Sequence, residues 1–167
     1  MPITIWGKNP LSKGTRCLLG TQSREALPGA ALWTPDRFAA AAGAFLQDAA
    51  GRLVLQVEAN TWLPGSSGPS MPAVWLRTLE ALEPQPGGMV VDVVRQGVSL
   101  AWVTLSDKGA RGEREDSSGP LIAELVSQAL PVAYSQGFVL PDSAPDLQGL
   151  LHRLSFVDRF DLLFTTG

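Results

Sequence analysis

The feature that most constrains the fold is a regular alternation of strand-like and helix-like segments between residues 99 and 167. The strand-like runs are short and apolar, whereas the helix-like runs repeat apolar residues every three or four positions. We predict strands at residues 99–105, at 132–140 with a bulge or turn at Gln136 and Gly137, and at 160–165, and helices at 120–130 and 143–156. Short connections in this order predict right-handed crossovers between parallel strands. We therefore expect an α/β fold containing a truncated doubly wound, Rossmann-like parallel sheet.

The first 95 residues follow a different pattern, which predicts a small α+β region. We predict strands at residues 16–20, 30–33, 52–58 and 89–94, and helices at 35–48 and 70–82. The first helix has a clear start signal, because Thr34 can cap it, Pro35 suits its first position and Asp36 favours the positive end of its dipole. We expect two domains, residues 1–95 and 96–167.

Two short stretches have the composition of turns or linkers. Residues 63–72 and 83–88 are rich in proline, glycine and serine, which do not sustain a helix or a central strand. We predict breaks in the first domain at both places.

Composition and charge narrow the class of protein. With 167 residues, 45% of them hydrophobic, the chain can bury a core. Its net charge is −3 and its basic residues are scattered, so it lacks the electrostatic footprint expected for a nucleic-acid partner.

Few residues are available for disulfides or soft metal sites. Cys17 is the single cysteine and His152 the single histidine, so we expect neither an intrachain disulfide nor a zinc site built from these residue types. The start of the chain lacks the features of a signal peptide, and no apolar stretch is long enough to span a membrane. We predict a cytoplasmic protein without a membrane partner.

Acids and glycines gather in the loop after the first strand of the α/β region. The loop contains Ser106, Asp107, Gly112 and Asp116, and it lies at the carboxyl end of a strand, where open parallel sheets bind ligands. Asp107 and Asp116 could hold Mg²⁺, which prefers oxygen ligands. Alternatively, Asp107 stabilises a turn and Asp116 favours the start of the next helix.

The same loop ends in Ser117, Ser118 and Gly119, just before Pro120. Free N–H groups at the start of a helix bind phosphate or carboxylate, so these residues form a candidate anion site. Capping of the helix by Ser118 explains the same residues without a ligand.

Three sequence patterns together resemble a known family. The first is Ser106-Asp107, Gly112 and 116–120; the second is Leu140-Pro141-Asp142; the third is the strand that ends in Thr165-Thr166-Gly167. Their types and order resemble the molybdenum cofactor biosynthesis proteins of the MoaB/Mog type, the molybdopterin adenylyltransferases, over residues 98–167.

The resemblance implies a function and a set of site residues. It implies ATP-dependent adenylylation of molybdopterin with Mg²⁺, a nucleotidyltransferase reaction, in a trimeric protein. Asp107 and Asp142 would be catalytic residues and ligands of Mg²⁺. The residues implied in binding molybdopterin and ATP are Ser106, Gly112, Asp116, Ser117, Ser118, Gly119, Thr165, Thr166 and Gly167. The patterns do not distinguish a molybdenum from a tungsten cofactor.

One departure from the family pattern bears on activity. In the family, the Thr-Thr-Gly sequence continues into a glycine-rich loop and the second half of the domain, whereas this sequence ends at Gly167. We therefore expect half a site, an inactive enzyme and exposed apolar surface on the incomplete sheet. The alternative is a non-catalytic protein that contacts molybdopterin, or assembles, without adenylylating it.

Overall fold

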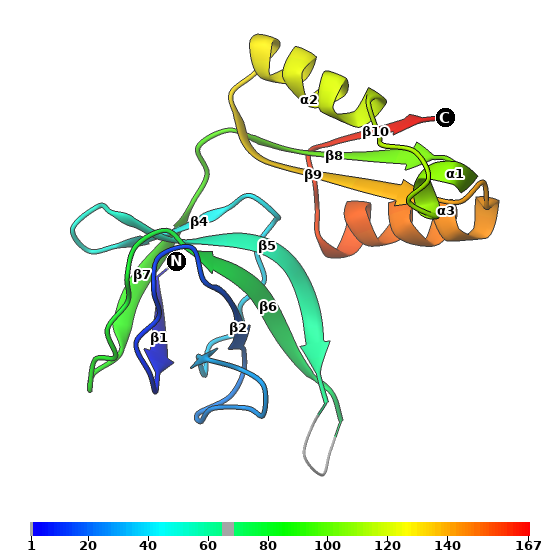
Figure 1. Cartoon of the computed structure of the whole chain (residues 1–167). Helices are drawn as coiled ribbons and strands as arrows, with labels where there is room; N and C mark the ends of the chain where they lie inside the picture. Colours follow the sequence, from blue (N-terminus) through cyan, green and yellow to red (C-terminus); the bar gives the residue numbers. More distant parts are fainter. Residues whose placement is uncertain (1, 65–68) are drawn as a thin grey trace. The chain divides into compact units, whose positions relative to one another are not determined.

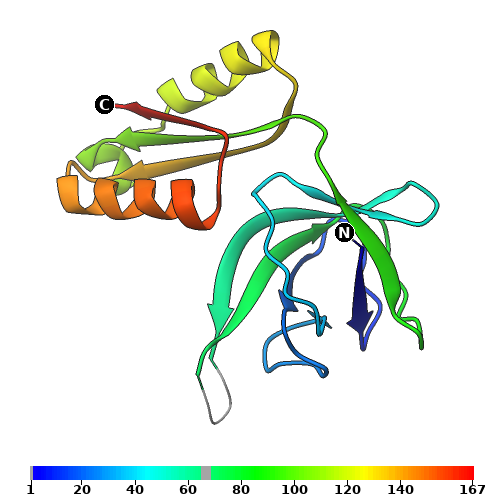
Figure 2. The same cartoon turned by 180° about the vertical axis from the view of Figure 1, so that it is seen from behind.

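The computed structural model describes residues 2–64 and 69–167 (Figures 1 and 2). The chain divides into two compact units, Met1–Arg95 and Gln96–Gly167. The predicted break at residues 63–72 lies partly outside the described residues, and the break at 83–88 is a loop.

The N-terminal unit is a closed β-barrel. Its described strands are β1 Ile3–Gly7, β2 Arg16–Gly20, β3 Leu32–Trp33, β4 Phe45–Asp48, β5 Leu53–Leu63, β6 Met71–Thr78 and β7 Met89–Val94. They pair in the order β1-β3-β2-β6-β5-β4-β7, and β7 pairs with β1 to close the barrel. Neighbours are antiparallel apart from β2 and β3.

Alternate side chains of these strands fill the barrel interior. Ile3 and Ile5 on β1 are buried, as are Val74 and Leu76, which belong to β6. Because side chains along a strand point alternately to its two faces, one face of each strand can supply the interior of a small barrel.

The two helices predicted in this unit are wrong, so the prediction of an α+β region is corrected to an all-β unit within the described residues. The start signal at Thr34 and Asp36 serves a loop instead. The Asp36 N–H donates to the Thr34 hydroxyl at 3.2 Å, and the Asp36 carboxylate accepts from the Thr4 N–H of β1 at 3.3 Å. Residues 37–44 then run without regular structure, with Phe38, Ala40 and Ala42 buried at a period of two.

The second predicted helix, at residues 70–82, is replaced by strand β6. Its apolar residues suggested a helical face because β6 is covered on both sides. Ala73 is buried as well as Val74 and Leu76, so the alternation expected of a half-exposed strand begins only at Val74.

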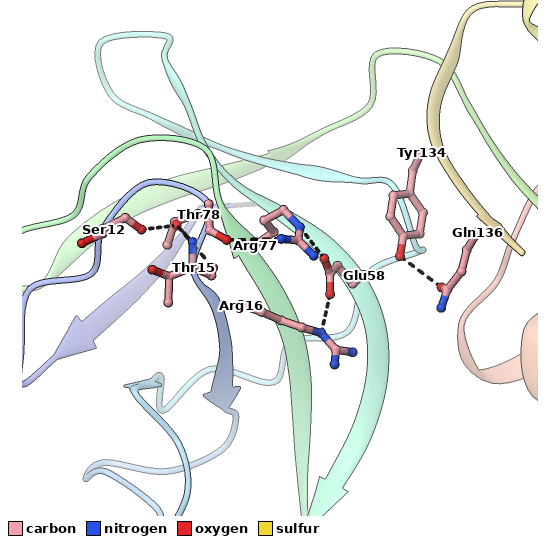
Figure 3. Close-up of polar contacts among 9 residues, drawn as sticks. Ser12, Thr15, Arg16, Glu58, Arg77, Thr78, Tyr134 and Gln136 are labelled. Atoms are coloured by element: carbon pink, nitrogen blue, oxygen red, sulfur yellow. Dashed lines mark hydrogen bonds and ion pairs between the residues drawn. The ribbon is translucent and has the colours of Figure 1, made fainter.

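A charged cluster on the barrel joins three neighbouring strands (Figure 3). The Glu58 carboxylate accepts from Arg16 Nε at 2.6 Å and from Arg77 Nε at 2.7 Å. The pairing register between β5 and β6 shifts between Val57 and Ala59, so Glu58 sits at a bulge. The Arg16 guanidinium also lies 4.2 Å from the Trp75 ring centroid.

The C-terminal unit is a parallel sheet with helices. Its elements are β8 Val98–Leu105, α1 Asp107–Ala110, α2 Ser118–Ala129, β9 Val132–Leu140, α3 Ala144–His152, a π-helical turn at Arg153–Val157, and β10 Leu162–Thr166. The strand order is β10-β8-β9, and both pairings are parallel. Helices α2 and α3 lie on opposite faces of the sheet (Figures 1 and 2).

The predicted alternation in this unit is confirmed, so the chain is a mixed α/β protein. Strand β9 runs unbroken through Gln136 and Gly137, where a bulge or turn was predicted. Leu121 and Leu125 belong to the apolar repeat of α2, but they are 54% and 56% exposed. The half-buried Ile122 and Val126 form a narrower contact stripe on this helix.

The predicted exposed apolar surface is present in this unit. The exposed large apolar side chains of this unit are Leu121, Leu125, Leu130, Val139, Phe156, Val157 and Phe164.

Candidate functional site

A polar pocket of about 290 Å³ lies at the carboxyl ends of the three parallel strands. It contains five residues that the sequence singled out: Ser106, Asp116, Ser117, Ser118 and Gly167. Its other lining residues are Thr104, Leu105, Gly109, Arg114, Glu115 and Val139. The predicted loop after β8 therefore lies where a ligand of a parallel sheet would bind, at the carboxyl ends of the strands.

The start of this loop is held by Ser106. The residue follows β8 and caps the short helix α1, with its hydroxyl accepting from the Gly109 N–H at 3.1 Å. Gly112 then takes a φ of +72°, a left-handed conformation that favours glycine and lets the chain turn toward α2.

Asp116 holds the first turn of α2. Its Oδ1 accepts from the backbone N–H groups of Ser118 and Gly119, each at 3.1 Å, and its Oδ2 accepts from the Trp102 indole N–H at 3.3 Å. Asp116 therefore caps this helix, and the Ser118 side chain does not. Of the three residues predicted to bind an anion, Ser118 and Gly119 already donate their N–H groups to the Asp116 carboxylate.

The environment of Asp116 favours its charged form. Partial burial acts to raise the pKa of this carboxyl, but the Gly119 N–H, the Thr104 hydroxyl, the Trp102 indole and the Ser118 N–H together lower it below its ordinary value. The buried Thr104 hydroxyl lies near the carboxylate, yet no described residue partners it at good hydrogen-bonding geometry.

Asp107 and Asp142 are brought together beside the pocket rather than in its lining. Asp107 Oδ1 accepts from the backbone N–H of Asp142 at 3.1 Å, which joins the loop after β8 to the loop after β9. Both residues are exposed. Asp107 is also the first residue of α1, so its position is compatible with both predicted roles, stabilising a turn and binding a ligand.

The remaining predicted residues surround this arrangement. Gly112 and Gly119 lie in the loop and in the first turn of α2, outside the lining. Thr165 and Thr166 belong to β10, where Thr166 pairs with Thr104 of β8. Gly167 reaches the pocket, and a Cβ added there would lie 3.2 Å from that of Leu105.

Trp102 and Thr104 are site residues that the sequence reasoning missed. They are two positions apart on β8, so they share a face of the sheet, and they meet Asp116 at the start of α2. Their spacing of two residues within the predicted strand is the sequence signal that places them on one face.

The basic residues of the loop are partly engaged with its own acids. Arg111 pairs with Glu113 at 2.8 Å, and this hydrogen bond raises the pKa of Arg111. Arg114 and Glu115 both line the pocket. His152 is exposed on α3, with its ring centroid 5.0 Å from that of Phe156.

The described residues show neither a cluster of candidate metal ligands nor a membrane-spanning helix. They contain no group of three or more His, Cys, Asp or Glu side chains placed to hold a metal ion. Among the helices of the described part of the chain, none is long and apolar enough to cross a membrane.

Fold and site define a mixed α/β protein whose C-terminal unit carries a polar pocket at the ends of its parallel strands. Molybdopterin adenylyltransferase from Pyrococcus furiosus is 40% identical to this chain over 65 residues, which are 39% of this chain and 37% of that protein. No protein-family model and no solved structure matches the chain. The similarity supports a MoaB/Mog-like relationship at most, over little more than a third of the relative's length.

Proposed function

We propose that the C-terminal unit binds molybdopterin in the pocket at the strand ends and acts in molybdenum cofactor biosynthesis. The observation that carries this proposal is the convergence of Ser106, Asp116, Ser117, Ser118 and Gly167, taken from two separate sequence patterns, on one pocket. The partial similarity to a molybdopterin adenylyltransferase supports the same ligand. We assign residues 96–167 to a MoaB/Mog-type domain, of which they supply the first half.

The order of the strands supports this assignment. Strand β8 is central, the first crossover leads to β9 on one side, and the second leads to β10 on the other. This order belongs to one half of a doubly wound sheet, in which ligands bind where the chain changes direction. The pocket residues Leu105 and Gly167 lie at the ends of β8 and β10, at that place.

The finer proposal is adenylylation of molybdopterin with ATP and Mg²⁺. Asp107 and Asp142 fit Mg²⁺, because they offer exposed carboxylate oxygens from adjacent loops and Mg²⁺ is commonly held by one or two carboxylates together with phosphate oxygens and water. Bound Mg²⁺ would neutralise phosphate charge during the transfer.

The residues of this chain contribute positioning. Asp116 fixes the first turn of α2, and Ser117 and Ser118 next to it line the pocket. Arg114, also in the lining, supplies a positive charge for a phosphate group.

The alternative is a binding or assembly protein without adenylylating activity. One observation favours it: the N–H groups of Ser118 and Gly119 are bonded to Asp116, so the start of α2 offers fewer donors to a phosphate. The candidate site therefore relies on side chains where an enzyme of this kind would also use backbone donors.

Binding of molybdopterin to the full chain tests the proposal. Under anaerobic equilibrium dialysis, we expect saturable binding that weakens about thirtyfold when Ser117 and Ser118 are both changed to Ala, since each change removes one neutral hydrogen bond of about 1 kcal/mol. Asp146→Asn is the matched control, because this acid lies in the first turn of α3, outside the pocket lining. No saturable binding, or equal loss in both variants, would refute the proposal.

Pyrophosphate release from Mg-ATP in the presence of molybdopterin separates the two functions. The enzyme hypothesis expects release that Asp142→Asn slows strongly while the unfolding midpoint stays unchanged. Saturable binding without release identifies the non-catalytic alternative. An unchanged rate in Asp142→Asn removes Asp142 from the mechanism.

A further inference from the structure

Trp102 occupies a space that two glycines leave open. A Cβ added to Gly119 of α2 would lie 1.7 Å from Trp102 Nε1, and one added to Gly137 of β9 would lie 2.5 Å from the indole ring. Real Cβ atoms do not approach other atoms so closely, so the indole contacts the backbone of both elements only because neither residue has a side chain.

The polar edge of the indole is used as well. Trp102 Nε1 donates to Asp116 Oδ2 at 3.3 Å, while the other carboxylate oxygen accepts from the first turn of α2. The carboxylate thus joins strand β8 to the start of α2. Thr104, on the same face of β8, adds a buried hydroxyl near that carboxylate.

We propose that Trp102 is a positioning residue for the pocket: it fixes the Asp116 carboxylate, and through it the first turn of α2 that carries Ser117 and Ser118. The inference rests on the proposed function for the identity of the ligand. Its structural half, the coupling of Trp102 to Asp116, does not depend on the ligand.

The physical reason is preorganisation. A carboxylate with one oxygen on the indole and the other on two backbone N–H groups has little rotational freedom. A ligand that meets the neighbouring hydroxyls then loses less affinity to the ordering of the loop. Without the indole N–H, Asp116 keeps its backbone donors but loses the bond that sets its orientation.

Nuclear magnetic resonance of the full chain, labelled with ¹⁵N at tryptophan, tests the coupling. The indole N–H signal of Trp102 is identified by its absence in Trp102→Phe. We expect it to shift with pH as Asp116 becomes protonated, at a pH below the ordinary range for aspartate, and to lose that response in Asp116→Asn. If the chemical shift of the Trp102 indole N–H does not change as Asp116 is protonated, the inference is overturned, whether or not molybdopterin binds.

Binding of molybdopterin tests the effect on the pocket. Trp102→Phe keeps an aromatic ring without the N–H, and we expect its affinity to fall about threefold to tenfold. The matched control is Trp62→Phe, an exposed tryptophan on β5 of the other unit, which should bind as the wild type does. Equal affinity in Trp102→Phe and the wild type refutes the positioning role.

The two proposals fail in different ways. If the wild type does not bind molybdopterin, the proposed function fails, and hydrogen exchange in the first turn of α2 then decides the inference. Faster exchange at Ser118 and Gly119 in Trp102→Phe supports positioning, and unchanged exchange rejects it. If Trp102→Phe does not fold, the Phe variants of the other four tryptophans assign the Trp102 signal by elimination, and the wild-type titration gives the decision.

Discussion

Asp116 is the side chain on which the first turn of α2 depends most directly, because its carboxylate accepts from Ser118, Gly119 and Trp102. We expect Asp116→Ala to lower the free energy of unfolding by about 1 kcal/mol near neutral pH, the usual loss for a helix cap. Urea denaturation followed by far-UV circular dichroism measures it, because every α-helix of the described residues belongs to the C-terminal unit.

The pH dependence of this loss follows from the sign of the pKa shift. The folded-state pKa of Asp116 lies below the ordinary value of 3.8, so its stabilisation is fully present above that ordinary value and disappears as pH falls through the folded-state pKa. The difference between the wild type and Asp116→Ala should therefore shrink in strong acid. A difference independent of pH would contradict the charged cap.

Glu58 presents the opposite case, an acid that is buried while its partners are half-exposed. Its side chain is 7% exposed, against 50% for Arg16 and 46% for Arg77. Removing both arginines leaves a buried carboxylate without its cationic partners, so we expect the free energy of unfolding to fall by roughly 3 kcal/mol. Glu58→Gln leaves arginines that water can reach, so we expect a smaller loss of about 1 kcal/mol. Calorimetry of Arg16→Ala/Arg77→Ala and Glu58→Gln checks this order, which the reverse ranking would contradict.

At the scale of elements, the packing of α2 against β8 and β9 depends on two glycines that accommodate Trp102. We expect Gly119→Ala to destabilise the C-terminal unit by about 1 to 3 kcal/mol, because its methyl group would overlap the indole. Gly149→Ala in α3 is the matched control. Apart from the backbone of its own helix and its chain neighbours, no atom lies within 4 Å of its added Cβ, so the change should be neutral or stabilise by up to about 1 kcal/mol. Urea midpoints of unfolding measure both effects. An unchanged midpoint in Gly119→Ala would show that the Trp102 indole can move to accommodate the methyl group.

The elements that could be predicted are those whose patterns have one physical reading. In the C-terminal unit, the repeat of apolar residues predicted helices at 120–130 and 143–156, where α2 and α3 lie, and Ser143 caps α3 by accepting from the Asp146 N–H at 3.5 Å. In the barrel, Thr34-Pro35-Asp36 is compatible with either a helix start or a turn. The tertiary bond from Thr4 to Asp36 accompanies the turn, and no local pattern reveals that bond.

The candidate site divides in the same way. Five pocket residues could be predicted, because sequence patterns identify the loops at the ends of strands: Ser106, Asp116, Ser117, Ser118 and Gly167. The partner of Asp116 was not predictable in that manner. Trp102 meets it only after α2 has packed on the sheet, and Gly119 and Gly137 gave no sign that they make room for an indole.

At the scale of the whole molecule, the two units differ in how much apolar surface they bury. The main core cluster lies in the barrel and includes Leu19, Leu46, Leu55 and Leu76, each with no exposed surface. The buried apolar side chains described in the C-terminal unit are Leu100, Ala101, Val103, Leu154 and Phe160. Because buried apolar area is the main source of stability, the barrel should be the more stable unit.

Separate expression of residues 1–95 and 96–167 tests this difference. We expect the first fragment to unfold cooperatively, since its barrel closes on itself and contains its own core. The second fragment should self-associate and bind an apolar dye, because Leu121, Leu125, Phe156 and Phe164 are exposed in it. Light scattering and dye fluorescence measure both properties, and Leu121→Lys/Leu125→Lys should weaken them. A monomeric second fragment that binds no dye, or a first fragment without cooperative unfolding, would contradict the division of stability between the two units.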